Sequence, residues 1–297
     1  MTTLGTGVVV GVDFSDASMA AAQFAAVEAQ WHRVPLHLVF VLQTPAAYGL
    51  SPYTVELEDW RRSASRDLAA LTTRLHQSHP DLVITESAPF GSPAASLIEA
   101  SRAARMLFVG CRGRGGFAEL LAGSVSAQVA AHATVPVIVV RDGADQPVPA
   151  GPVLVGVDGT PVSAAAIEFA FAEADARGVP LVAYHVWWDP RAASVDDGPI
   201  GRFDLERVQQ SAERTVAEAV AGWREKYPDV VVQLRLVYST NEEAGLIDAS
   251  ATAGLVVVGS RGRGAVRGLL LGSVGQALVH HGQCPIAIVH GPFDRAR

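Results

Sequence analysis

The chain contains the stretch Gly110-Cys111-Arg112-Gly113, followed after nine residues by Gly123-Ser124, and it carries the same pattern a second time. The second copy reads Gly259-Ser260-Arg261-Gly262, then nine residues, then Gly272-Ser273. Residues 110 and 259 are 149 positions apart, which is half of the 297-residue chain. The repeat therefore predicts two copies of one domain. Because glycine has no Cβ, each copy lets the backbone approach a ligand closely, and a phosphate is the ligand that this pattern favours.

Earlier landmarks repeat as well. Val8–Asp13 matches Val153–Asp158, and Val34-Pro35-Leu36 matches Val179-Pro180-Leu181, both at an offset of 145. The second copy thus carries a net four extra residues between its second strand and its glycine motif, a difference that belongs in a loop.

Each half alternates short apolar runs with helical patterns, which predicts a doubly wound α/β domain with a parallel sheet and helices on both faces. Strands are expected at 8–13, 36–42, 82–88, 106–110 and 136–141, and again at 152–158, 181–187, 230–237, 255–259 and 285–290. Helices are expected at 16–31, 54–77, 92–104 and 122–132, and again at 162–177, 204–226, 242–252 and 270–281. The predicted domains are 1–143 and 153–297, joined by a proline-rich linker at 144–152.

Composition narrows the class of protein. The net charge is −7 and no basic stripe is visible, so a nucleic-acid partner is not expected. The N-terminus lacks a basic signal-peptide region and no apolar run approaches the length of a membrane span, so a cytoplasmic protein is expected. The nine histidines show no metal-ligand spacing, so no protein metal centre is expected. Cys111 and Cys284 are not shared between the halves, which favours a packing role for both.

The first strand of each half ends on an aspartate, Asp13 or Asp158, followed two residues later by a candidate helix N-cap, Ser15 or Thr160. In open α/β sheets, ligands bind beyond the carboxyl ends of the strands. Each aspartate therefore has two interpretations: it helps to cap the helix, or its carboxylate accepts a hydrogen bond from a ligand.

The glycine motif follows the fourth strand of each half, and Gly123-Ser124 and Gly272-Ser273 open the next helix. The free N–H groups at that helix N-terminus would receive an anion. Arg112 and Arg261, each followed two residues later by another arginine, suit phosphate oxygens, with a solvated loop arginine as the alternative. The glycines could also serve only strand-to-helix packing.

This constellation resembles the universal stress protein family, in the tandem form of its ATP-binding subclass. The resemblance rests on Gly-x2-Gly-x9-Gly-Ser after a fourth strand, on the aspartate that ends the first strand, and on Val-Pro-Val-Ile-Val-Val in the last strand. It covers nearly the whole chain, once per half.

The resemblance implies the strand order 3-2-1-4-5 and one ATP per half. It places Asp13 and Asp158 near the adenine and ribose, and it lets the backbones of Val41 and Val186 bond the adenine edge. The implied phosphate contacts are Gly110, Arg112, Gly113, Gly123, Ser124, Val125 and Ser126 in the first half, and Gly259, Arg261, Gly262, Gly272, Ser273, Val274 and Gly275 in the second. Family members dimerise through the fifth strand, so the two fifth strands, at 136–141 and 285–290, are expected to pair with each other and remove two exposed edges.

A catalytic apparatus is not visible in the sequence. It contains no Gly-x4-Gly-Lys-Ser/Thr loop, and His185 aligns with Phe40, so no histidine near the motif is shared that could act as a general base. The leading hypothesis is therefore a nucleotide-dependent stress regulator that forms homodimers and acts on an unknown protein partner. The alternatives are a slow ATP hydrolase or phosphotransferase, with Ser and Asp positioning Mg²⁺, and a scaffold whose nucleotide sites are vestigial.

Overall fold

The computed structural model describes residues 7–43, 57–113, 123–141, 151–188, 205–262 and 271–291. The chain falls into two compact units that divide near residue 150, and Pro285–Ile288 packs with the first unit. Most of the predicted linker at 144–152, and the predicted starts of the helices at 54 and 204, lie outside the described residues. No helix in the part of the chain that the structure describes is long and apolar enough to cross a membrane.

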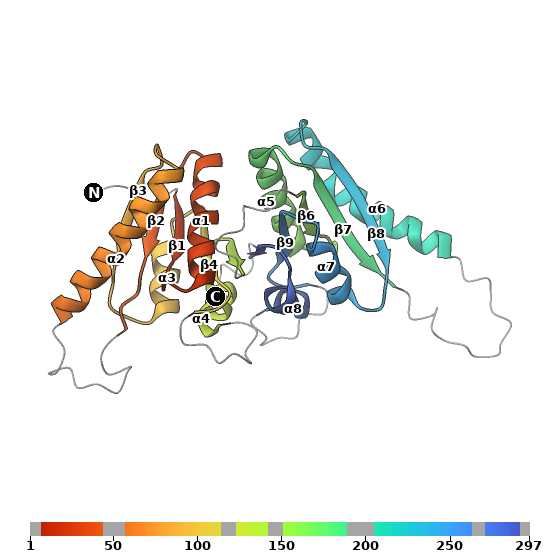
Figure 1. The fold of residues 1–297 in the computed structure, drawn as a ribbon. Helices are drawn as coiled ribbons and strands as arrows, with labels where there is room; N and C mark the ends of the chain where they lie inside the picture. The colour runs from red at the N-terminus through yellow and green to blue at the C-terminus, as the bar shows by residue number, and fades with distance from the viewer. Residues whose placement is uncertain are drawn as a thin grey trace. The chain divides into compact units, whose positions relative to one another are not determined.

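The first half is a doubly wound α/β sheet with the predicted strand order 3-2-1-4-5. Helices α1 and α2 pack on one face and α3 and α4 on the other, as right-handed crossovers require (Figure 1). Its elements are β1 Val8–Gly11, α1 Asp16–Trp31, β2 Leu36–Val39, α2 Leu57–Ser78, β3 Ile84–Ser87, α3 Pro93–Ser101, β4 Met106–Gly110, α4 Ser124–His132 and β5 Val137–Val140.

The second half repeats this architecture with the order β10-β9-β6-β7-β8, in which β6 pairs in parallel with both β7 and β9. Its elements are β6 Val153–Gly156, α5 Pro161–Arg177, β7 Leu181–Trp187, α6 Leu205–Lys226, β8 Val232–Tyr238, α7 Glu242–Ser250, β9 Leu255–Gly259, α8 Ser273–His281 and β10 Ile286–Val289. The predicted fold class is confirmed in both halves.

The core lies where the sheet is covered on both faces. Val8, Val9 and Val10 of β1 are buried, as a parallel strand with helices on both sides must be. Helix α1 contributes seven buried alanines, whose small side chains let it pack closely on β1 and β4. The central strands are therefore closely packed on both faces, and their carboxyl ends form one edge of the sheet.

The first strands end earlier than predicted, at Gly11 and Gly156 rather than at the aspartates. The last ladder bonds run from Val12 N to Val39 O and from Val157 N to Tyr184 O, both 2.9 Å. Past that point the chain turns into α1 or α5, so Asp13 and Asp158 lie in the turn beyond the sheet and not in a strand.

The predicted pairing of the two fifth strands is confirmed. Strand β10 pairs antiparallel with β5, with Ala287 opposite Ile138. Through this pairing Pro285–Ile288 belongs to the first compact unit although it lies near the end of the chain.

Candidate nucleotide site

The aspartate that follows the first strand of each half accepts hydrogen bonds from the N-cap residue of the next helix. Asp158 Oδ1 accepts hydrogen bonds from Thr160 N at 2.9 Å and from Thr160 Oγ1 at 2.7 Å. Asp13 Oδ1 makes the same pair of bonds with Ser15, from N at 3.1 Å and from Oγ at 2.5 Å. Ser15 and Thr160 are the N-caps of α1 and α5, as predicted.

The second carboxylate oxygen of each aspartate lies against the glycine motif. A Cβ built on Gly262 would come within 3.0 Å of Asp158 Oδ2, and a Cβ on Gly113 would meet Asp13 Oδ2 even more closely. One oxygen therefore serves the helix cap, while the other reaches the glycine loop. The two interpretations of the aspartate are thus compatible with one geometry.

A backbone hydrogen bond closes each glycine motif. Gly123 N donates to Cys111 O at 2.7 Å, and Gly272 N donates to Ser260 O at 2.9 Å. These bonds bring the two ends of each motif together, although most of the nine residues between them, including Arg114 and Arg263, lie outside the described residues.

The glycines of the motif differ in whether packing within the protein requires a residue without a Cβ. A Cβ on Gly110 would lie 2.7 Å from Ser18 N, and one on Gly259 would lie 2.8 Å from Val162 Cγ1, so both are needed for packing against the following helix. A Cβ on Gly272 would make only ordinary contacts, the nearest being Arg261 Cα at 3.5 Å. Packing of the protein therefore does not demand glycine at 272.

The N-termini of α4 and α8 are capped by Gly123 and Gly272, which have no side chain to accept the first N–H groups of these helices. Ser124 and Ser273 are exposed on the first turn beside these N–H groups. Free N–H groups, the positive end of the helix dipole and a hydroxyl form a suitable receptor for an anion.

Ser126 lies differently from the other predicted phosphate contacts. Its side chain is buried, with 2% of the residue exposed, and Oγ lies 3.1 Å from Cys111 O and 2.9 Å from Gly123 O. The hydroxyl therefore donates into the closed loop. The matching Gly275 in α8 is also buried but has no hydroxyl to make this bond.

The backbones of Val41 and Val186 face the same edge. Val39 O and Tyr184 O accept the last ladder bonds from the first strands, so the residues two positions later direct their N–H and C=O to the same side, beyond the ends of those strands. Val41 and Val186 thus present a donor and an acceptor above the crevice.

The second half holds a cavity of 420 Å³ at this edge, within the range of about 300–1,000 Å³ typical of small-molecule sites. All nine candidate residues of this half line it, namely Asp158, Val186, Gly259, Arg261, Gly262, Gly272, Ser273, Val274 and Gly275. The sequence reasoning missed several others that line it, among them Ser163, Tyr184, His185, Glu242, Leu246 and Leu271.

In the first half, the structure brings Asp13, Gly113 and the Gly123 end of the motif together through the contacts above. Arg112 contributes its carbonyl oxygen, which lies 3.2 Å from Ser15 Oγ. Its side-chain Nε is buried and has no hydrogen-bond partner among the described residues. A buried guanidinium nitrogen in this state fits an anion as its partner.

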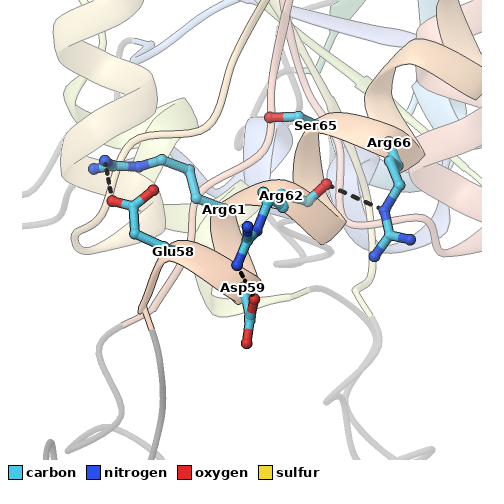
Figure 2. Close-up of a pocket in the computed structure, with 6 residues that line it drawn as sticks. All are labelled: Glu58, Asp59, Arg61, Arg62, Ser65 and Arg66. Atoms are coloured by element: carbon cyan, nitrogen blue, oxygen red, sulfur yellow. Dashed lines mark hydrogen bonds and ion pairs between the residues drawn. The ribbon is translucent and has the colours of Figure 1, made fainter.

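A second hollow, of 610 Å³, lies along the first turns of α2 (Figure 2). Among the described residues it is lined by exposed residues of that one helix, and Arg61 and Arg62 pair there with Glu58 and Asp59 at i,i+3 spacing. It lies on the helix surface rather than at the strand ends, so the carboxyl edge of each sheet is the candidate site.

Comparisons with known proteins agree with this arrangement. The family described as "Universal stress protein family" matches residues 6–141 and again 150–290. A universal stress protein of Mycobacterium tuberculosis is 39% identical over 289 residues, which cover 95% of this chain and 96% of that relative. One from Mycolicibacterium smegmatis is 38% identical over 291 residues, again 95% of this chain and 96% of the relative. The crystal structure of a universal stress protein from Archaeoglobus fulgidus superposes with a TM-score of 0.71 at 20% identity, covering 96% of this chain and 98% of that one, and shares the fold.

Proposed function

Because the chain belongs to the universal stress protein family, with two family domains in tandem, we propose that each half binds one ATP and that occupancy regulates a protein partner. The cavity of the second half carries this proposal, since all nine candidate residues of that half line it.

The chemistry of the site suits an adenine nucleotide. The adjacent N–H and C=O of Val186 complement the acceptor and the amino group on the edge of adenine. The uncapped N–H groups of α8 lie at the other side of the cavity and suit the phosphates. In the first half, the buried Nε of Arg112 supports the same assignment. Mg²⁺ would accompany the phosphates, because oxygen ligands such as carboxylates and hydroxyls are those it prefers.

We propose binding rather than turnover. The carboxylate of Asp158 is already engaged by Thr160 through one oxygen, and Arg261, which lines the cavity, remains protonated. These two groups therefore supply no general base for water, and the proposal gives His185, which also lines the cavity, a bond to the nucleotide rather than to water. Steady-state phosphate release well below about one per minute, against about 10 per second for a typical enzyme, is the expected result.

The test is the nucleotide content of the freshly purified chain, measured by mass spectrometry of released ligands, followed by calorimetric titration with ATP. We expect two sites per chain. Gly272→Val should remove one site while the chain stays folded, because a Cβ at this position makes only ordinary contacts with the protein. Gly222→Val, in an exposed part of α6 with no atom near its Cβ, is the matched control and should keep both sites.

If the unmodified chain carries no nucleotide after purification and does not bind ATP in the titration, the proposal is overturned in favour of a scaffold. We further propose that the chain is cytoplasmic and forms homodimers, with light scattering after size exclusion as the measurement of its mass.

A further inference from the structure

Three buried polar side chains line the cavity of the second half among the described residues: Ser163, Tyr184 and His185. One of them, His185, has incomplete hydrogen bonding within the part of the protein that the structure describes. Ser163 Oγ donates to Thr160 O at 2.9 Å, and Tyr184 Oη donates to Gly245 O at 3.0 Å. Both hydroxyls therefore use their proton inside the protein.

His185 differs from these two. It is 5% exposed, and its Nδ1 lies 2.6 Å from Val157 O. A carbonyl oxygen only accepts hydrogen bonds, so Nδ1 must carry the proton. In the neutral ring Nε2 is then an acceptor, and no described residue forms a hydrogen bond with it.

The position of His185 explains what Nε2 can meet. It lies in β7 between Tyr184 and Val186, beside the end of β6, and it lines the cavity together with Val157 and Asp158. The tautomer is held by the backbone of the sheet, so the acceptor is fixed before any ligand arrives.

The first half has no such acceptor at the matching position. Phe40 occupies the position of His185, and its ring packs 5.1 Å from that of Phe14. Phe14 takes a left-handed backbone conformation with φ 61°, where the second half has Gly159 at φ 76°. At this position the first half therefore has an apolar aromatic side chain and the second half has a hydrogen-bond acceptor.

We infer that His185 determines ligand selectivity in the second half by accepting, at Nε2, a hydrogen bond from an N–H or O–H donor of the bound nucleotide. This inference rests on the proposed ATP binding. The donor is either the amino group of the base or a hydroxyl of the ribose, and the first half, with Phe40, makes no equivalent bond. The two sites of one chain therefore bind the same nucleotide with different selectivity.

The test uses the full chain with the first site removed by Gly123→Val, so that titration reports on the second site; a Cβ at 123 would lie 3.2 Å from Cys111 O, so this variant alone is the reference for fold and affinity. Adding His185→Phe, the residue of the first half, should weaken ATP binding about five- to tenfold, as expected for one lost hydrogen bond. His185→Gln, which retains an acceptor, should restore most of the affinity. Thermal unfolding of each variant without ligand checks that the fold is kept.

Analogues identify the donor. Purine riboside triphosphate lacks the amino group, and 2′-deoxy-ATP and 3′-deoxy-ATP each lack one hydroxyl. With the analogue that lacks the bonded group, His185→Phe should cause no further loss. In the unmodified chain, ATP should shift the imidazole ¹⁵N resonance of Nε2, and that analogue should not.

The outcomes separate the two proposals. If the unmodified chain binds no ATP, the proposed function and this inference both fail. If it binds ATP at both sites but His185→Phe leaves the affinity unchanged, or lowers it equally for all four nucleotides, only the inference is overturned. The reciprocal change, Phe40→His with Gly272→Val, should introduce sensitivity to the same analogue in the first site.

Discussion

Asp158 Oδ2 lies so near Gly262 that an added Cβ would come within 3.0 Å of it, and in the first half Asp13 and Gly113 approach even more closely. The helix cap and the glycine loop are therefore joined through a single carboxylate. A change on either side must disturb the other.

Alanine at these glycines should destabilise the protein. Gly262→Ala should cost at most about 1 kcal/mol, because only the end of the Asp158 side chain must shift and its bonds to Thr160 weaken, and Gly113→Ala should cost more because its contact is closer. Urea unfolding measures both. The control is Gly222→Ala, which has open space on an exposed helix and should be neutral or stabilising. Equal stabilities for all three variants would contradict this geometry.

Two substitutions at Asp158 should separate its roles. Asp158→Asn retains an oxygen for the bonds from Thr160, so the loss of stability should be small, while ATP affinity at the second site should fall. Asp158→Ala removes the oxygen as well and should cost about a further 1 kcal/mol. Urea unfolding and ATP titration of both variants measure these effects. Normal ATP binding by Asp158→Asn would contradict a ligand role for the carboxylate.

Ser126→Ala should act on stability rather than on the nucleotide. Its buried hydroxyl donates to carbonyls of the closed loop, so its loss should cost about 1 kcal/mol. The exposed neighbour Ser124 should show the opposite pattern when changed to alanine, with weaker ATP binding and unchanged stability. A Ser126→Ala protein of normal stability that no longer bound ATP in the first half would instead mean that this hydroxyl contacts the ligand.

Burial raises the pKa of the Cys284 thiol to about 12, with smaller opposing effects from the backbone at Val256 and from Arg177. A thiol in the unfolded chain ionises near its ordinary pKa of about 9, so the folded state binds the extra proton between those values. The stabilisation that the buried neutral thiol adds to the free energy of unfolding is complete below pH 9 and is lost as the pH rises toward 12.

Cys284→Val installs the residue found at the matching position 135 and has no thiol to titrate. Above pH 9 its free energy of unfolding should therefore rise relative to that of the unmodified chain, by at most about 1.4 kcal/mol per pH unit. Urea unfolding of both proteins at pH 8, 9 and 10 measures it. A difference that stays constant over this range would show that Cys284 does not titrate as its burial requires.

Much of this fold follows from local patterns in the sequence. The buried β-branched runs and the N-cap residues Ser15 and Thr160 indicated the strands and helices closely, because each depends on neighbours within a few residues. The strand ends were less well predicted. Whether Asp13 lies in β1 or in the turn depends on where the neighbouring strand supplies its last carbonyl, which is a tertiary property.

The candidate site was found only in part, for a related reason. Comparison of the two halves finds residues that both share, such as the glycines and the aspartates. Tyr184, His185 and Glu242 also line the cavity, but the first half has Val39, Phe40 and Pro93 at these positions, so the comparison overlooked them. The direction of a side chain, as for the buried hydroxyl of Ser126, is likewise set by packing.

The pairing of β10 with β5 has a consequence during synthesis. The strand that covers the edge of β5 ends at Val289, whereas β5 itself ends at Val140, so 149 residues must be added before the partner exists. At about 5–20 residues per second this takes about 7–30 seconds. Throughout that interval the nascent first half has its strands β1 to β5 but nothing paired along the outer edge of β5, and the same edge strand of a neighbouring nascent chain could pair there in place of β10.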